Sequence, residues 1–232
     1  MTLDNEIEVK IKSLISDLEN KKYNNVISKA LELIKTNNKI PVIFNILGVS
    51  YSLIDRHKEA INAYNRASFL EPKNEEVFRN LGKSYTKLNL LKEAEDSFDT
   101  AIRIKPSNPD AYFGKGILFL QIKDLENSLK NFEKTLELNS RFYQAYYNIG
   151  IVQNLLGNLY EAQTSYIRAI NINENYFQAF NNLGTVLINL KKNGDAINVL
   201  KKAIEIRPNY EQALTNLGVA YLDLKKYKES LI

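Results

Sequence analysis

The sequence contains no cysteine and only one histidine, His57. Without cysteine the chain has no disulfide framework, no thiol nucleophile and no cysteine-ligated metal site. A single histidine forms no histidine cluster, so the common metal centres and nucleophilic triads are largely excluded. We therefore expect a protein that is not an enzyme, with no catalytic residues, no bound metal and no cofactor.

Long apolar runs are also missing. The first ten residues carry Asp4, Glu6 and Glu8 and no apolar segment, which is unlike a secretory signal. An uncharged stretch over residues 144–160 contains five Asn or Gln side chains, so it is too polar and too short to cross a bilayer. The sequence predicts a cytoplasmic protein that does not bind membranes.

A strong charge of one sign is absent too. The chain has 31 basic and 27 acidic residues, a net charge of +4, and its lysine pairs are scattered. Proteins that bind nucleic acid usually gather basic residues into one patch or stripe, so we expect no nucleic-acid partner. The 44% hydrophobic and 25% charged content is typical of a folded, soluble chain.

Glycine is scarce but periodic. Six of the nine glycines recur at an interval of 34 residues, and several follow an Asn-Leu or Asn-Ile pair inside what otherwise resembles a helix. Such a glycine costs about 1 kcal/mol relative to alanine, so its repeated placement calls for a structural reason. The six periodic glycines are Gly48, Gly82, Gly116, Gly150, Gly184 and Gly218.

Each 34-residue unit, numbered here from Pro41 as position 1, has the pattern of two helices. Positions 4, 7, 8 and 11 lie on one helical face, and positions 20, 24 and 27 form the apolar face of a second helix. Polar turns lie between the helices, and prolines such as Pro72 and Pro106 end the units. Each unit is therefore predicted to be a helix hairpin ended by a helix breaker.

This hairpin explains the periodic glycine. Two antiparallel helices approach closely only where the residues in contact are small. We expect glycine at position 8 and alanine at position 20 to make room for the large rings at positions 4, 11 and 24.

At these positions the sequence resembles the tetratricopeptide repeat family, strongly over residues 41–232 and weakly over 7–40. The resemblance implies an all-α, right-handed superhelical solenoid of antiparallel helix hairpins, with about six and a half repeats, as one domain over residues 1–232. The predicted units are a divergent repeat at 7–40, full repeats at 41–74, 75–108, 109–142, 143–176 and 177–210, and a partial repeat at 211–232.

The two ends of the array differ from the middle. The 7–40 unit lacks the glycine and is predicted to act as an atypical cap. At the other end, residues 227–232 are predicted to open a second helix and then stop, which leaves the preceding helix uncovered. We expect the missing helix to come from a longer native chain, from a partner, or from a second copy in a homo-oligomer joined at this end.

Positions 2, 5, 6, 9, 12 and 13 of each first helix lie opposite the core face and would line the concave groove. Asparagine recurs at position 6, and its amide carries both donors and an acceptor suited to an extended peptide backbone. The alternative is that these asparagines are exposed to solvent and contact no ligand. The candidate groove residues are Asn80, Asn148, Asn182, Asn216, Arg79, Lys83, Phe113, Tyr147 and Asn181.

We therefore expect a non-catalytic scaffold that binds peptide or protein segments in its concave groove. The asparagine row is also similar to that in the tetratricopeptide arm of O-linked N-acetylglucosamine transferases. That similarity implies an alternative, the substrate-recruiting arm of a larger glycosyltransferase. A second alternative is a module that self-assembles through its C-terminal end.

Overall fold

The computed structural model describes residues 3–229, and all regular secondary structure in that range is α-helical. The prediction of an all-α chain is thus confirmed. The helices are α1 (Leu3–Glu19), α2 (Tyr23–Thr36), α3 (Pro41–Ser52), α4 (His57–Leu70), α5 (Glu75–Lys87), α6 (Leu91–Ile104), α7 (Pro109–Gln121), α8 (Leu125–Leu138), α9 (Tyr143–Leu155), α10 (Leu159–Ile172), α11 (Phe177–Asn189), α12 (Asn193–Ile206) and α13 (Glu211–Glu229).

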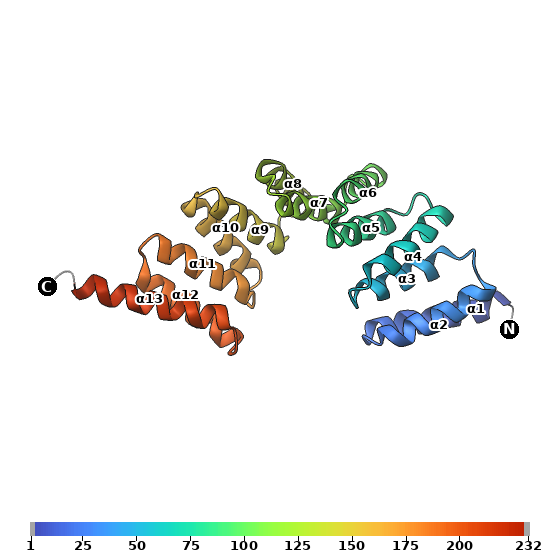
Figure 1. Cartoon of the computed structure of the whole chain (residues 1–232), viewed down its shortest axis with the longest axis horizontal. Coiled ribbons are helices and arrows are strands. Elements are labelled where there is room, and N and C mark those ends of the chain that lie inside the picture. The colour runs from blue at the N-terminus through green and yellow to red at the C-terminus, as the bar shows by residue number, and fades with distance from the viewer. Residues whose placement is uncertain (1–2, 230–232) are drawn as a thin grey trace. The chain divides into compact units, whose positions relative to one another are not determined.

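The helices pair into hairpins, and the hairpins stack in chain order within two compact units, Met1–Leu118 and Phe119–Ile232. In the first unit α3 packs on α4 and α5 on α6, while α2 and α4 each contact the first helix of the next hairpin. In the second unit α9 packs on α10 and α11 on α12, and the same stacking continues to α13 (Figure 1). This stacking places the first helices of the second unit, α9, α11 and α13, next to one another.

Gly48, Gly82 and Gly150 lie against the ring at position 24 of the second helix, as the hairpin argument predicts, and Gly184 lies against Leu200 at the same position. A Cβ built on Gly48 would lie 2.5 Å from Cε1 of Tyr64, and one built on Gly150 would lie 2.6 Å from Cε1 of Tyr166. Tyr64 and Tyr166, both at position 24, are almost completely buried. The glycine therefore sets the distance between the two helices of a hairpin, because any side chain there would displace the central ring of the repeat.

Each hairpin turn uses one residue in the left-handed backbone conformation, at position 15. The amide at position 16 donates to the carbonyl at position 11, as Arg56 does to Tyr51 at 2.9 Å, which satisfies an end carbonyl of the first helix. Glycine is the usual residue in such a conformation, yet it stands at this position in one turn alone. The residues with positive φ are Lys21 (58°), Asp55 (59°), Asn89 (59°), Lys123 (61°), Gly157 (81°) and Lys191 (60°).

Replacing Lys123 by glycine is expected to raise the free energy of unfolding by about 1 kcal/mol, because a lysine backbone is strained in this region and glycine is not. Chemical denaturation followed by circular dichroism measures the change. The control is Lys123→Ala, which removes the same side chain but keeps the strained backbone and should bring no comparable gain. Equal gains from both variants would show that the side chain, not the backbone, is responsible.

The last helix differs from the prediction. α13 continues without a break to Glu229, so the predicted turn and a second helix starting at Tyr227 are wrong for the described residues, and residues 230–232 lie outside them. A left-handed residue at position 15, here Lys225, is stabilised elsewhere by the second helix packing back on the first. At Lys225 no second helix is described that could offset this strain, and leucine and lysine favour continued helix.

The third repeat departs from the family pattern at several core positions, and the structure accounts for them. Lys115 at position 7 is only 15% exposed, and its ammonium group pairs with Asp99 at 2.6 Å and Glu95 at 3.4 Å on α6. Thr135 at position 27 is fully buried, and its hydroxyl donates to the Asn131 carbonyl of its own helix at 2.9 Å. The polar groups are thus satisfied, so the more polar core positions of this repeat do not leave these buried groups without partners.

Candidate functional site

The first helices of the second unit are joined by a chain of side-chain hydrogen bonds. Asn216 on α13 donates to the amide oxygen of Asn181 on α11 at 2.9 Å. Asn181 donates to the amide oxygen of its neighbour Asn182 at 3.2 Å, and Asn182 donates to the hydroxyl of Tyr147 on α9 at 3.2 Å. Four of the predicted groove residues therefore form one network that crosses three successive repeats.

Further hydrogen bonds fix the orientation of these amides. The Asn216 amide also donates to the hydroxyl of Thr185 at 3.1 Å. The amide of Asn148 donates to the Gln144 carbonyl of its own helix at 2.7 Å. Because each amide has a defined internal partner, its remaining donors and acceptors point in set directions.

The four predicted groove asparagines of the second unit are not exposed to solvent in the way that the alternative reading of the sequence expected. Asn148 is 8% exposed and Asn181 is 5% exposed, while Asn182 and Asn216 are half-buried. Position 6 lies close to the central ring of the preceding repeat: a Cβ on Gly114 would overlap the ring of Phe98, which accounts for the missing asparagine there. The residue at position 6 is therefore part of the contact between repeats as well as a predicted groove residue.

A group of aromatic rings lies around Tyr147, and its other members were not predicted from the sequence. The ring of Tyr176 meets those of Tyr143 and Tyr147 with centroids 5.0 and 4.9 Å apart, and Phe177 meets Tyr210 at 4.9 Å. These contacts join the end of one repeat to the start of its neighbours. We call Tyr143, Tyr147, Tyr176, Phe177 and Tyr210 the tyrosine cluster.

A signal for this cluster is present in the sequence at position 34, the residue before each first helix. In the first unit this position holds Ile40 before α3 and asparagine before α5 and α7, and Asn74 accepts from the Val77 amide at 3.4 Å as a helix cap. In the second unit the same position holds Tyr176 before α11, with no side-chain cap. An asparagine cap stabilises a helix by about 1 kcal/mol, so an aromatic residue at this position indicates another use.

Burial raises the pKa of Tyr147, Tyr166 and Tyr176 above the usual value for tyrosine, so these three hydroxyl groups stay protonated at neutral pH. A hydroxyl that accepts from Asn182, as that of Tyr147 does, still has its own proton to donate.

The predicted groove positions of the second unit carry almost no charge. These are positions 2, 5, 6, 9, 12 and 13 of α9, α11 and α13, all of them described, and Asp223 is the one charged residue among them. The others are amide, hydroxyl or apolar side chains. Arg207 lies beside this face with its guanidinium 4.9 Å from the centre of the Phe177 ring.

The groove residues predicted in the first unit have a different environment. Arg79 pairs with Glu75 one turn earlier at 3.3 Å, with both side chains under one fifth exposed. Lys83 is exposed, but partial loss of hydration, followed by the nearby Arg79 charge, lowers its pKa. Asn80 and Phe113 are half-buried on α5 and α7. These four residues belong to the first unit, whereas the hydrogen-bonded network belongs to the second.

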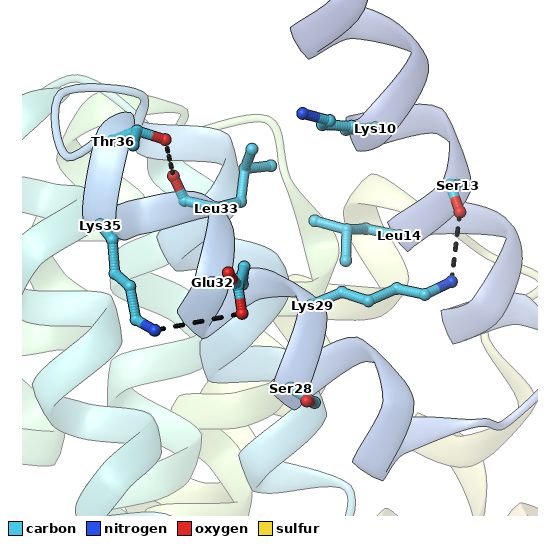
Figure 2. Close-up of a pocket in the computed structure, with 9 residues that line it drawn as sticks. All are labelled: Lys10, Ser13, Leu14, Ser28, Lys29, Glu32, Leu33, Lys35 and Thr36. Atoms are coloured by element: carbon cyan, nitrogen blue, oxygen red, sulfur yellow. Dashed lines mark hydrogen bonds and ion pairs between the residues drawn. The ribbon is translucent and has the colours of Figure 1, made fainter.

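A hollow lies between α1 and α2 in the first unit (Figure 2). It has a volume of about 540 Å³ and three lysines in its lining, which at first suggests an anion site. Each ammonium group already faces a carboxylate: Lys10 meets Glu6 at 2.6 Å, Lys29 meets Asp17 at 2.6 Å and Lys35 meets Glu32 at 4.0 Å. The hollow therefore has no excess positive charge to hold an anion.

The single histidine, His57, has a side chain only 10% exposed, with Nε2 3.6 Å from the carboxylate of Asp55. No group of three metal-ligating side chains occurs among residues 3–229. Over the same residues, no helix has the length and apolar character needed to cross a membrane.

Comparison with known families assigns the repeats to a family. Three family models match, described as "TPR repeat" over residues 186–225 and as "Tetratricopeptide repeat" over residues 55–109 with 81–133 and over 143–176. Together these matches span more than half of the sequence. The chain belongs to the tetratricopeptide repeat family, and the resemblance seen in its sequence is confirmed. None of the curated proteins gives a significant sequence match.

Solved structures share the fold at low sequence identity. PilW, titled a type IV pilus biogenesis factor, superposes with a TM-score of 0.82 at 17% identity, over 90% of this chain and 97% of that one. A chain of the Cut9–Hcn1 complex gives 0.79 at 18% identity over 91% of this chain, which spans only 42% of that protein. YrrB, titled a protein with an unusual peptide-binding site, gives 0.58 at 22% identity over 80% and 96%. These similarities confirm the tetratricopeptide solenoid fold.

Proposed function

We propose that the chain is a non-catalytic interaction module that binds an extended peptide segment along the first helices of its second unit. The observation that carries the proposal is the hydrogen-bonded row from Asn216 through Asn181 and Asn182 to Tyr147. Amides and hydroxyls held at set positions lose little entropy when they bind a peptide backbone, which favours affinity.

The surrounding features support the same surface. The tyrosine cluster presents half-buried rings beside the polar row, and Val219 and Leu222 add exposed apolar surface on α13. Interfaces commonly combine aromatic anchors with a few positioned polar groups. The first unit, where Arg79 is already paired with Glu75, has less polar capacity left for a ligand.

A library of random 12-residue peptides selected on the intact chain tests this function. Selected peptides are expected to bind at least tenfold more weakly to a triple variant, Asn148→Ala, Asn182→Ala and Asn216→Ala, as measured by fluorescence polarisation. That variant also loses internal hydrogen bonds, each contributing about 1 kcal/mol to stability, so its unfolding must be measured in parallel.

A gentler variant separates binding from stability. Gln178→Glu with Thr215→Glu adds two charges to the groove face without removing any of the hydrogen bonds described, and it is also expected to weaken binding. The matched control for the triple alanine variant replaces three exposed asparagines on second helices by alanine. These are Asn62, Asn65 and Asn198, and this control should bind as the native chain does. Peptides that bind all variants equally would refute the proposed surface.

A further inference from the structure

We infer that this groove face selects an uncharged, proline-containing segment in the polyproline II conformation. The inference rests on the proposed function and adds the class of peptide. Three features of the second unit carry it: the near absence of charge at the groove positions, the half-buried rings beside the Tyr147 hydroxyl, and the succession of α9, α11 and α13 as neighbouring helices.

The missing charge selects against charged ligands. A lysine or glutamate laid on α9, α11 and α13 would lose part of its hydration. The charged groups near this face are already engaged: the Asp223 carboxylate lies 4.0 Å from the Lys191 ammonium group, and the Arg207 guanidinium lies over the Phe177 ring. Burying an unpaired charge is far more costly than burying an amide, which the neighbouring Asn and Gln side chains can satisfy. The face therefore accepts peptides whose side chains are polar but uncharged, or apolar.

The tyrosine cluster and its donors match proline. Proline has no backbone N–H, so a proline-rich segment presents mainly carbonyl acceptors. The Tyr147 hydroxyl accepts from Asn182 and keeps its own proton to donate to such a carbonyl. The rings of Tyr143, Tyr176 and Tyr210 are half-buried and meet their neighbours edge-on or tilted, which leaves apolar surface for proline rings.

The usual spacing of packed helices is similar to the length of one polyproline II turn. Packed helices lie about 8–10 Å apart, and α9, α11 and α13 are direct neighbours. A polyproline II helix rises about 3.1 Å per residue with three residues per turn, so one turn advances about 9 Å. A segment running across the three helices therefore presents the same side of its helix once per repeat, and a stiff segment in this conformation loses little entropy on binding.

The test compares four acetylated nine-residue peptides by fluorescence polarisation against the intact chain: three copies each of Pro-Pro-Gln, Ala-Ala-Gln, Pro-Pro-Glu and Pro-Pro-Lys. The Pro-Pro-Gln peptide is expected to bind at least about tenfold more tightly than each of the others, which corresponds to about 1.4 kcal/mol. Tyr147→Phe, which keeps the ring and loses the hydroxyl, and Tyr210→Ala should each weaken this binding about five- to tenfold. Tyr160→Ala is the matched control, because Tyr160 is 65% exposed on the second helix α10.

The outcomes separate the two proposals. Equal binding of the Pro-Pro-Gln and Ala-Ala-Gln peptides would overturn the preference for proline, and tighter binding of either charged peptide would overturn the selection against charge. In both cases the proposed peptide-binding surface would stand if Tyr147→Phe still weakened binding. Binding that is insensitive to Tyr147→Phe and Tyr210→Ala but lost in Tyr160→Ala would instead place the ligand on the second helices of the hairpins and refute the proposed function.

Discussion

Replacing Gly150 by leucine is expected to lower the free energy of unfolding by about 3 kcal/mol. The position is the point of closest approach between α9 and α10, where even a Cβ would lie 2.6 Å from Cε1 of Tyr166. The Tyr166 ring is 1% exposed and its centroid lies 5.8 Å from that of Tyr147, so moving it aside would disturb the neighbouring packing. The hairpin must therefore open, and its contacts with α11 weaken with it. Urea denaturation followed by circular dichroism measures the loss.

The same repeat position supplies the control. Gly218 on α13 has no atom within 4 Å of a Cβ built on it. Gly218→Ala should therefore stabilise the chain by up to about 1 kcal/mol through helix propensity alone, whereas Gly150→Ala should destabilise it despite the same gain in propensity. Equal effects of the two alanine variants would contradict the close-approach role of the glycine.

Replacing Phe98 by alanine is expected to lower the free energy of unfolding by about 3–5 kcal/mol, the usual range for a buried phenylalanine. Its ring is 1% exposed and lies against both Gly82 of α5 and Gly114 of α7, so one side chain fills the space between two successive repeats. Neither glycine has a side chain that could move into the cavity. In a stacked array the loss should appear as weaker coupling of α7 to α6, measurable as faster amide hydrogen exchange there.

An exposed phenylalanine shows whether burial is the cause. Phe69 on α4 is 73% exposed, and Phe69→Ala should change the free energy of unfolding by less than about 0.5 kcal/mol. If Phe98→Ala were equally mild, the central ring at position 24 would not be what holds neighbouring repeats together.

The fold could be predicted because its determinants repeat. Gly48 and Gly150 stand one hundred and two residues apart in equivalent surroundings, so the 34-residue period exposed the hairpin and its small contact residues together. The left-handed residue at position 15 escaped prediction because its identity varies from Lys21 to Asp55 to Gly157. The continuous helix at the end escaped it because the pattern of Lys225 and its neighbours does not differ from that of a repeat that turns.

The site was predicted only in part. Asn148, Asn181, Asn182 and Asn216 follow from helical spacing, since residues at positions 5 and 6 must lie opposite the core face. Their mutual hydrogen bonds could not be deduced, because they depend on the distance between neighbouring first helices. Tyr176 and Tyr210 stand just outside the helices, where side-chain direction is set by the connecting turn, so helical periodicity says nothing about them.

The most direct test of the account is an NMR titration of the uniformly ¹⁵N-labelled chain with a peptide from the library selection. The side-chain amide groups of Asn181, Asn182 and Asn216 give resonances of their own. The account predicts that these signals, with backbone amides of α9, α11 and α13, show the largest shifts. Shifts confined to α10 and α12, or to the hollow between α1 and α2, would contradict it.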